Sequence, residues 1–232
     1  MNVLVTAGAT QVPIDKVRSI SNIFKGRTGF EIAKYFTWPI NHPQAWPDTL
    51  TAYPANSVTL ITSNPDLVIE EMGGNCGFAL EGYRTFDELV TLMEQHINGG
   101  HYDVIIHSAA VSDYRVSRVL DSNLKELDNS QKISSQHGKM YLELEPTIKI
   151  VDQIRKPWGF TGKLVKFKLQ VGISDEELLA IAGKSRIASE ADLIVANCLE
   201  WARERAYILG ADRCETVARI NLPEALYTRV TS

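Results

Sequence analysis

Residues 16–26, KVRSISNIFKG, combine charged, amide and turn-forming residues shortly after an apolar run at the start of the chain. Arg18 and Asn22 lie four residues apart, and Gly26 and Gly29 follow them. An arginine donates to anionic oxygens, an amide both donates and accepts hydrogen bonds, and glycines let backbone N–H groups approach a phosphate. The G-x-G-x-x-G spacing of a dinucleotide-binding loop is absent. The segment therefore indicates an anion-binding site and gives dinucleotide binding little support.

A second segment, HSAAVSDYR at residues 107–115, also combines small and charged residues. Ala109 and Ala110 leave room for a ligand against the backbone after a buried strand. Asp113 offers a metal or hydroxyl contact, and Arg115 offers an anion contact. On residue types alone, an ordinary surface loop is the simpler interpretation.

Five single residues extend the pattern, and three of them have a plainer alternative. Gly8 follows the first apolar run, where a turn glycine without a ligand is an equally good interpretation. Lys132, in a polar loop, could close over a site and neutralise charge on a phosphoryl group, although most such lysines are simply solvated. Phe167 could stack on a base, but core packing is more common. Lys184 could reach a base or phosphate, and Asn197 ends a predicted strand.

Composition excludes several classes of function. The chain has 232 residues, of which 44% are hydrophobic and 22% charged, values typical of a soluble globular protein. A net charge of -4 gives no basic surface for nucleic acid. No apolar run approaches the roughly 20 residues of a membrane-spanning helix. The three cysteines lack C-x-x-C spacing and the N-terminus lacks a signal-peptide pattern, so we expect a cytoplasmic protein without a disulfide framework or a zinc site, and we assign no residue as a metal ligand.

Alternating strand-like and helix-like segments predict the fold. Expected strands are residues 2–6, 57–62, 103–107, 140–145, 163–169 and 192–196, and expected helices are residues 29–36, 85–98, 146–156, 175–189 and 222–230. This order predicts one α/β domain over residues 1–232, with a Rossmann-like, doubly wound, mostly parallel sheet and helices on both faces. Residues 116–139 are polar and predicted to be a flexible excursion, and residues 38–56, with four prolines, a loop. Ligands of such sheets bind where the strands end, and most of the residues above follow a strand end.

Taken in order, these segments resemble the phosphopantothenate–cysteine ligase (phosphopantothenoylcysteine synthetase) family. The matching pieces are GATQVPIDKVRSISNIFKGRTG, SAAVSDYR, KIS at residues 132–134, EPTI at residues 145–148, and KFKL followed by KSRIASEADLIVAN. The resemblance covers almost the whole chain, with residues 38–56 as the main unmatched piece. The chain resembles the stand-alone form of the ligase, which lacks the flavin-dependent decarboxylase to which the ligase is often fused. No FMN is therefore expected.

The resemblance implies a role for each matched position. Asn22 and Lys132 would be catalytic, Asn22 holding the acyl intermediate and Lys132 closing over it, and Arg18 would meet the substrate phosphate. Substrate binding falls on Arg18, Asn22, Ala109, Ala110 and Asp113. Nucleotide binding falls on Gly8, Gly26, Gly29, Asp113, Lys132, Phe167, Lys184 and Asn197.

The implied reaction joins 4'-phosphopantothenate and L-cysteine to 4'-phosphopantothenoylcysteine in coenzyme A biosynthesis. CTP or ATP, with Mg²⁺, converts the carboxylate into an acyl-nucleotide with loss of pyrophosphate, and the cysteine amine then attacks it. Activation is needed because a free carboxylate is a poor electrophile, and the developing negative charge must be met by fixed donors. The family forms homodimers, so a homodimer is expected.

Two other functions stay open. Phe24 and Lys25 stand where the family has two serines, Lys166 where it has a glycine, and Ala188 where it has a second lysine. These departures are compatible with a non-catalytic paralogue that binds nucleotide or pantothenate. An NAD(P)-dependent oxidoreductase is a weaker alternative, because none of the eight tyrosines is followed by lysine in Tyr-x-x-x-Lys spacing.

Overall fold

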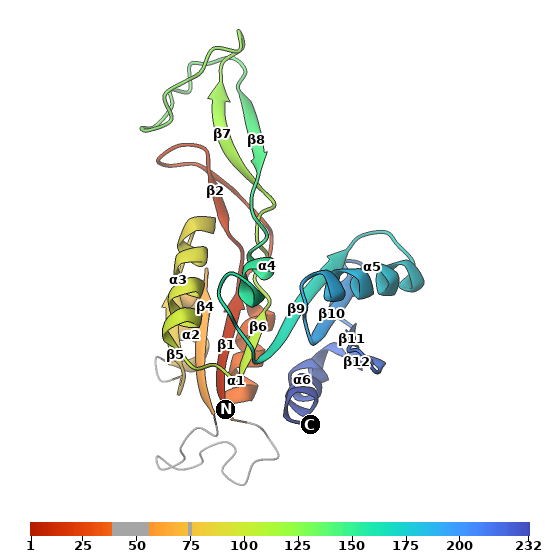
Figure 1. Ribbon diagram of the computed structural model, residues 1–232. Coiled ribbons are helices and arrows are strands. Elements are labelled where there is room, and N and C mark those ends of the chain that lie inside the picture. Colours follow the sequence, from red (N-terminus) through yellow and green to blue (C-terminus); the bar gives the residue numbers. More distant parts are fainter. Residues whose placement is uncertain (39–55, 74–75) are drawn as a thin grey trace.

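Strands from across the chain form one mostly parallel sheet. The computed structural model describes residues 1–38, 56–73 and 76–232 (Figure 1). The sheet strands are β1 (Asn2–Ala7), β4 (Ser57–Thr62), β5 (Ala79–Gly82), β6 (Val104–His107), β9 (Lys163–Gln170), β10 (Leu193–Cys198), β11 (Arg205–Leu209) and β12 (Cys214–Ala218). Within the described residues the order is β12-β11-β10-β9-β6-β1-β4-β5, with only the pairs that involve β11 antiparallel. The predicted mostly parallel, doubly wound sheet is confirmed.

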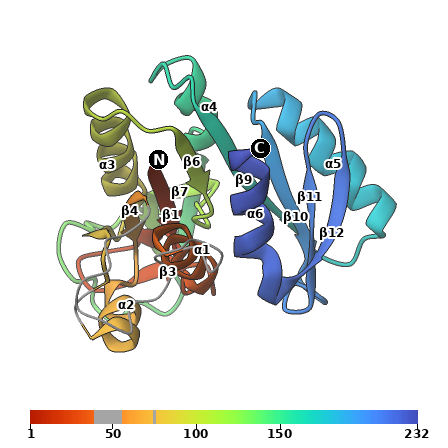
Figure 2. The same cartoon turned by 90° about the horizontal axis from the view of Figure 1, so that it is seen from below.

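Helices cover both faces of the sheet (Figures 1 and 2). One face carries α1 (Arg27–Thr37), α2 (Pro65–Met72) and α6 (Leu222–Thr231), which share a hydrophobic cluster with alternate residues of the strands. The other face carries α3 (Phe86–Gly99), α4 (Ile150–Arg155) and α5 (Asp175–Ala188). The alternation is visible in β1, where Val3 and Val5 pack toward α1 and Leu4 packs toward α3.

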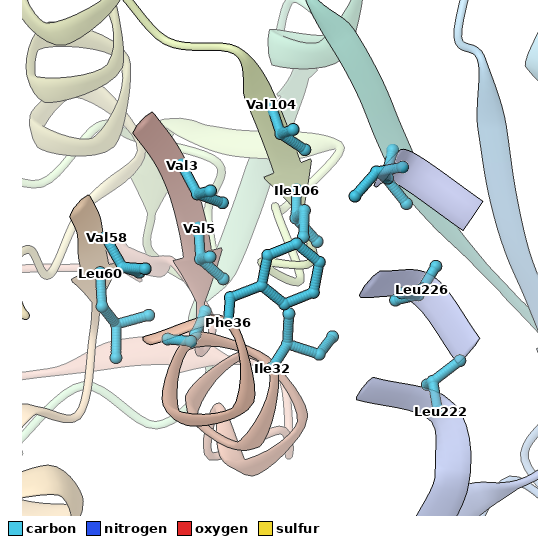
Figure 3. Packing of buried hydrophobic residues seen from close by; sticks show 14 of the residues in the cluster. Val3, Val5, Ile32, Phe36, Val58, Leu60, Val104, Ile106, Leu222 and Leu226 are labelled. Atoms are coloured by element: carbon cyan, nitrogen blue, oxygen red, sulfur yellow. The ribbon is translucent and has the colours of Figure 1, made fainter. Parts of the chain in front are cut away.

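The core between the sheet and α1 is built from branched and aromatic side chains (Figure 3). Ile32 and Phe36 of α1 are fully buried against Val3, Val5 and Leu60. The ring of Tyr227 on α6 meets that of Phe36 edge-on, with 5.2 Å between the ring centroids. This packing fixes where α1 begins relative to the strand ends.

Helix starts follow local capping signals, and one predicted start is wrong. Thr85 is the N-cap of α3 and forms a capping box with Glu88, as the sequence predicts. That helix runs one residue further than expected and includes Gly99. Pro146 does not start a helix: it ends a strand, and α4 begins at Ile150. The physical reason is that residues 141–146 pair with an antiparallel neighbour, which keeps the backbone extended up to the proline.

A pair of strands, here named the arm, projects from the body of the protein beyond the carboxyl ends of β1 and β6 (Figure 1). It consists of the antiparallel strands β7 (Tyr114–Leu120) and β8 (Tyr141–Pro146), with the short pair β2 (Gln11–Pro13) and β3 (Ser19–Ser21) beside its base. Residues 116–120, predicted as part of a flexible excursion, are strand. Ion pairs between Arg115 and Glu145 and between Arg118 and Glu143 explain how so polar a strand is held.

Several short elements were not predicted. They are α2, β2, β3, β5, β11 and β12. Residues 39–55, most of the predicted 38–56 loop, lie outside the described part of the chain. None of the helices in that part combines the length and apolar composition that a bilayer crossing requires.

We expect Ile32→Ala to lower the free energy of unfolding by about 2–5 kcal/mol, because it leaves a cavity between α1 and the sheet. Alanine favours helix more than isoleucine does, so the loss reports packing alone. Ile187→Ala is the matched control, since Ile187 is also helical but 69% exposed, and we expect it to change stability by less than about 0.5 kcal/mol. Urea denaturation of both variants measures the difference, and equal effects would contradict the packing described.

Candidate functional site

The site lies where the order of the strands reverses. The connection from β1 leads outward to β4, whereas that from β6 leads the other way to β9, so the loops after β1 and β6 separate two halves of the sheet. The N–H of Ala110 donates to the Gly8 carbonyl at 2.8 Å, which keeps these two loops side by side. Such switch points at the carboxyl ends of parallel strands are where doubly wound folds bind ligands.

A first cavity, here named the glycine cavity, has a volume of about 290 Å³ and opens between the ends of β1, β6 and β9 and the start of α1. Gly8 and Gly26 both have left-handed backbones, with φ of 86° and 84°. A Cβ on Gly26 would lie 2.8 Å from the Gly8 nitrogen, so both positions require glycine. The first residues of α1 line this cavity, which places the positive end of the helix dipole beside it.

A second cavity, here named the lysine cavity, has a volume of about 670 Å³, within the range of small-molecule sites. Four lysines line it: Lys149, Lys166, Lys168 and Lys184. Asp113 and Asp152 are the acidic residues in its wall. The two cavities adjoin, because the same five residues line both: Phe24, Ala109, Ala110, Phe167 and Leu169.

Most of the predicted site residues meet at these two cavities. The glycine cavity contains Gly8, Gly26, Gly29, Ala109, Ala110, Phe167 and Asn197. Asn22, Asp113 and Lys184 line the lysine cavity. The Asn22 amide donates from Nδ2 to the Ala110 carbonyl at 3.2 Å, which joins the loop before α1 to the loop after β6.

Arg18 and Lys132 lie elsewhere. Neither lines the glycine or the lysine cavity. Instead, Arg18 donates from Nη2 to the carbonyl of Ile133 at 2.7 Å, so Arg18 lies beside the residue that follows Lys132. The two predicted residues are therefore brought together at the arm, away from the other predicted residues.

Asp15 holds this second cluster. Its carboxylate is fully buried in an ion pair with Arg18 and also accepts from the backbone N–H groups of Val17, Arg18 and Ile133. The Arg18 guanidinium holds the pKa of Asp15 well below its usual range. Burial alone would raise this pKa, and the three backbone N–H groups help to lower it. Sequence reasoning missed Asp15, although a carboxylate three residues before Arg18 was a visible signal.

Sequence reasoning also missed several cations of the cavity walls, two of which have their pKa lowered by burial. Lys166 lines the lysine cavity, and burial lowers its pKa. Arg219 lines the glycine cavity, donates to the Thr28 hydroxyl at the start of α1, and has its pKa lowered by burial. A lysine between the apolar residues Val165 and Phe167 of a predicted strand was a usable signal, whereas nothing in the sequence places Arg219 near residue 28.

His107 is a buried, uncharged residue in the wall of the lysine cavity. Burial, and secondarily the charge of Lys166, lower the pKa of His107 to about 4. Its Nδ1 lies 2.8 Å from the Thr6 hydroxyl. The imidazole is therefore uncharged at neutral pH, and the positive charge here comes from the lysines. In the described part of the chain, no three His, Cys, Asp or Glu side chains gather as a metal site.

Fold and site together define a Rossmann-like α/β protein with cation-lined cavities at the switch point of its sheet. The chain belongs to the family described as DNA/pantothenate metabolism flavoprotein C-terminal domain, whose model matches residues 1–38 and 56–217. This confirms the family resemblance predicted from the sequence.

Curated relatives extend the comparison. The chain is 34% identical over 230 residues to the coenzyme A biosynthesis bifunctional protein CoaBC of Thermococcus kodakarensis, a match covering 96% of this chain and 48% of that protein. It is 25% identical to the CoaBC protein of Bacillus subtilis, covering 84% of this chain and 40% of that protein. The chain thus spans about half or less of the length of these relatives.

Solved structures show the same fold. The crystal structure of the DNA/pantothenate metabolism flavoprotein from Streptococcus pneumoniae superposes with a TM-score of 0.79 and 29% identity, covering 100% of this chain and 98% of that one. The C-terminal domain of a CoaBC protein superposes with a TM-score of 0.66 at 18% identity, covering 99% and 93%. The latter likeness concerns the fold alone.

We expect Asp15→Asn to destabilise the protein in a pH-dependent way. Because the folded-state pKa of Asp15 lies below the unfolded value of about 3.9, the ionised carboxylate stabilises the fold above that pH. This contribution is lost as the pH falls toward and through the folded-state pKa. The melting temperature of the variant should therefore lie below that of the wild type at pH 7, and the difference should shrink below about pH 4.

Thermal unfolding from pH 7 to pH 3 measures this, with Asp66→Asn as the control because Asp66 is exposed in the first turn of α2. A constant difference across that range would contradict the ion pair as the source of the effect.

Proposed function

We propose that this chain joins 4'-phosphopantothenate and L-cysteine into 4'-phosphopantothenoylcysteine, with CTP or ATP as the activating nucleotide. The observation that carries the proposal is the meeting of ten predicted substrate and nucleotide residues at two adjoining cavities. Membership of the pantothenate metabolism family and the names of the CoaBC relatives support the same step of coenzyme A biosynthesis. A single functional domain over residues 1–232 is part of this proposal.

The two cavities suit different parts of the ligands. The glycine cavity, with the start of α1, Lys25, Arg27 and Arg219 in its wall, suits a triphosphate. The larger lysine cavity suits the remainder of the nucleotide and the pantothenate portion. Phe167, which lines both, lies at the junction between them.

The proposed reaction has two steps. A carboxylate oxygen of 4'-phosphopantothenate bonds to the α-phosphorus, and pyrophosphate leaves. The cysteine amine then attacks the acyl carbon, loses a proton, and the nucleoside monophosphate leaves with the carboxylate oxygen. Asn22, beside Ala110 in the cavity wall, is positioned to donate to the oxygen of the acyl group as its charge develops.

Mg²⁺ would accompany the nucleotide. The ion is commonly held by phosphate oxygens and one or two carboxylates, and Asp113 in the lysine cavity fits that role. It would neutralise charge on the triphosphate. FMN has no part in either step.

A homodimer is part of the proposal, because Arg18 and Lys132 lie outside the cavities of their own chain. The arm exposes large apolar side chains, among them Tyr114, Tyr141 and Leu144, which are 52%, 47% and 47% exposed. Exposed apolar side chains of this kind suit an interface with a second copy. In that arrangement Lys132 of one copy would close over the acyl intermediate in the other.

A second candidate function is binding without turnover. Phe24 and Lys25 line the glycine cavity at the two positions where the resemblance predicts serines, and Phe24 is 41% exposed. A lysine is a point donor and does not reproduce two short hydroxyl contacts to a triphosphate. The observation favours altered nucleotide preference or a non-catalytic paralogue.

We expect pyrophosphate release that requires 4'-phosphopantothenate, Mg²⁺ and either CTP or ATP. A coupled pyrophosphate assay run with each nucleotide separately measures both activity and preference. Tight binding of nucleotide by calorimetry without release under any condition would establish the non-catalytic alternative. If the protein shows neither nucleotide binding nor pyrophosphate release, the proposed function is wrong.

We expect Asn22→Asp to lower the rate of pyrophosphate release by about 10²-fold, because it replaces an amide donor with a carboxylate near a developing negative charge. Asn22 is exposed, so the melting temperature should stay near that of the wild type. Asn98→Asp, the same change on the exposed surface of α3, is the matched control and should keep full activity. An Asn22→Asp variant with wild-type activity would show that this residue has no catalytic role.

A further inference from the structure

Lys166 is a buried lysine in the middle of strand β9. Only 8% of its surface is exposed, and it lies beside the fully buried Val165. Lysine is seldom buried unless its charge is paired, because removing an ammonium from water is costly. Its presence at this position therefore needs a physical reason.

The protein satisfies the hydrogen bonds of Lys166 only in part. Its Nζ donates to the carbonyl of Ser185 at 3.2 Å and to the hydroxyl of Ser189 at 3.0 Å, both on or next to α5. An ammonium has three N–H donors, so one remains. Both acceptors are neutral, and among the described residues no carboxylate forms an ion pair with Lys166.

The surroundings add more positive charge than negative. Burial is the main cause that lowers the pKa of Lys166, and Lys168 and Lys149 lower it further, opposed by Asp152. His107, its neighbour in register on β6, is neutral at neutral pH. The two aspartates of the lysine cavity do not balance its four lysines, and neither forms an ion pair with Lys166, so a bound anion would supply the counter-charge that a buried ammonium requires.

We propose that Lys166 binds an oxygen acceptor of the nucleotide in the lysine cavity and is an affinity-determining residue of this site. The inference rests on the proposed function, because the ligand is the nucleotide of that reaction. The acceptor chemistry has two sources in such a ligand: a phosphate oxygen, or an oxygen of the base or ribose.

A purely structural role makes a different prediction. If Lys166 only ties β9 to α5, its replacement should lower stability and leave the affinity of the folded protein unchanged. Lys166→Met keeps the apolar stem and removes the charge, and Lys166→Gln keeps a donor without the charge. Lys163→Met is the control, because Lys163 is an exposed residue of the same strand that lines neither cavity.

The test is calorimetric titration of the full chain with CTP, ATP and inorganic triphosphate in the presence of Mg²⁺, together with melting temperatures. We expect Lys166→Met to weaken nucleotide binding by at least about tenfold, as is typical for loss of a hydrogen bond from a charged donor, while Lys163→Met binds like the wild type. If Lys166→Met does not fold, the comparison is made with Lys166→Gln.

The outcomes separate the possibilities. Equal weakening for nucleotides and inorganic triphosphate identifies a phosphate acceptor, and weakening for nucleotides alone identifies the base or ribose; both support the proposal. Affinities within twofold of the wild type for every ligand overturn it and leave the proposed function standing. A wild-type chain that binds no nucleotide overturns the proposed function, and this inference with it.

Discussion

The structure depends on the close approach of three backbone segments at the end of the central strand. A Cβ on Gly26 would lie 2.8 Å from the Gly8 nitrogen, and a Cβ on Gly8 would lie 2.1 Å from the Ser63 hydroxyl oxygen. The ends of β1 and β4 and the start of α1 therefore meet with no room for side chains. Because both glycines have left-handed backbones, any other residue would be strained as well as crowded. This contact places the first turn of α1 at the switch point, and the glycine cavity exists because of it.

The arm depends on a different constraint, which is a buried charge. Asp15 accepts hydrogen bonds from Arg18 and from the backbone of Ile133, so one carboxylate links the β2–β3 hairpin to a segment more than a hundred residues later. Ile133 is 4% exposed, which adds apolar burial to the same junction. Because the Asp15 side chain is fully buried, the removal of Arg18 would leave a buried carboxylate without its cationic partner, and such losses are costly. The position of Lys132 is thus tied to that of Arg18.

The sequence predicted the layers of the fold, and most of the residues it proposed for the site line the two cavities, because hydrophobic periodicity and strand ends are local signals. Strands β1, β4, β6, β9 and β10 were predicted within about two residues at each end. Pairing between segments was not predictable in the same way. Residues 116–120 look like polar loop until β8 is present to pair with them, and β11 and β12 form the antiparallel edge of a sheet predicted to be mostly parallel. In the site, too, single residues were predictable but contacts between segments were not. Asn22 and Ala110 were predicted separately, but only the fold shows that the Asn22 side chain donates a hydrogen bond to the Ala110 carbonyl.

The charge around the lysine cavity depends on where the fold places individual side chains and not on the net charge of the chain. The whole chain carries a net charge of -4, yet the lysine cavity gathers four lysines against two aspartates. These lysines come from the start of α4, from β9 and from α5, so no single segment of sequence is strongly basic. Their mutual repulsion, and the burial of Lys166, raise the free energy of the protein without a ligand. An anion that binds in the cavity relieves both costs, and a ligand that binds only the folded state stabilises it. If the site binds an anion as proposed, its occupancy would raise the stability of the folded protein.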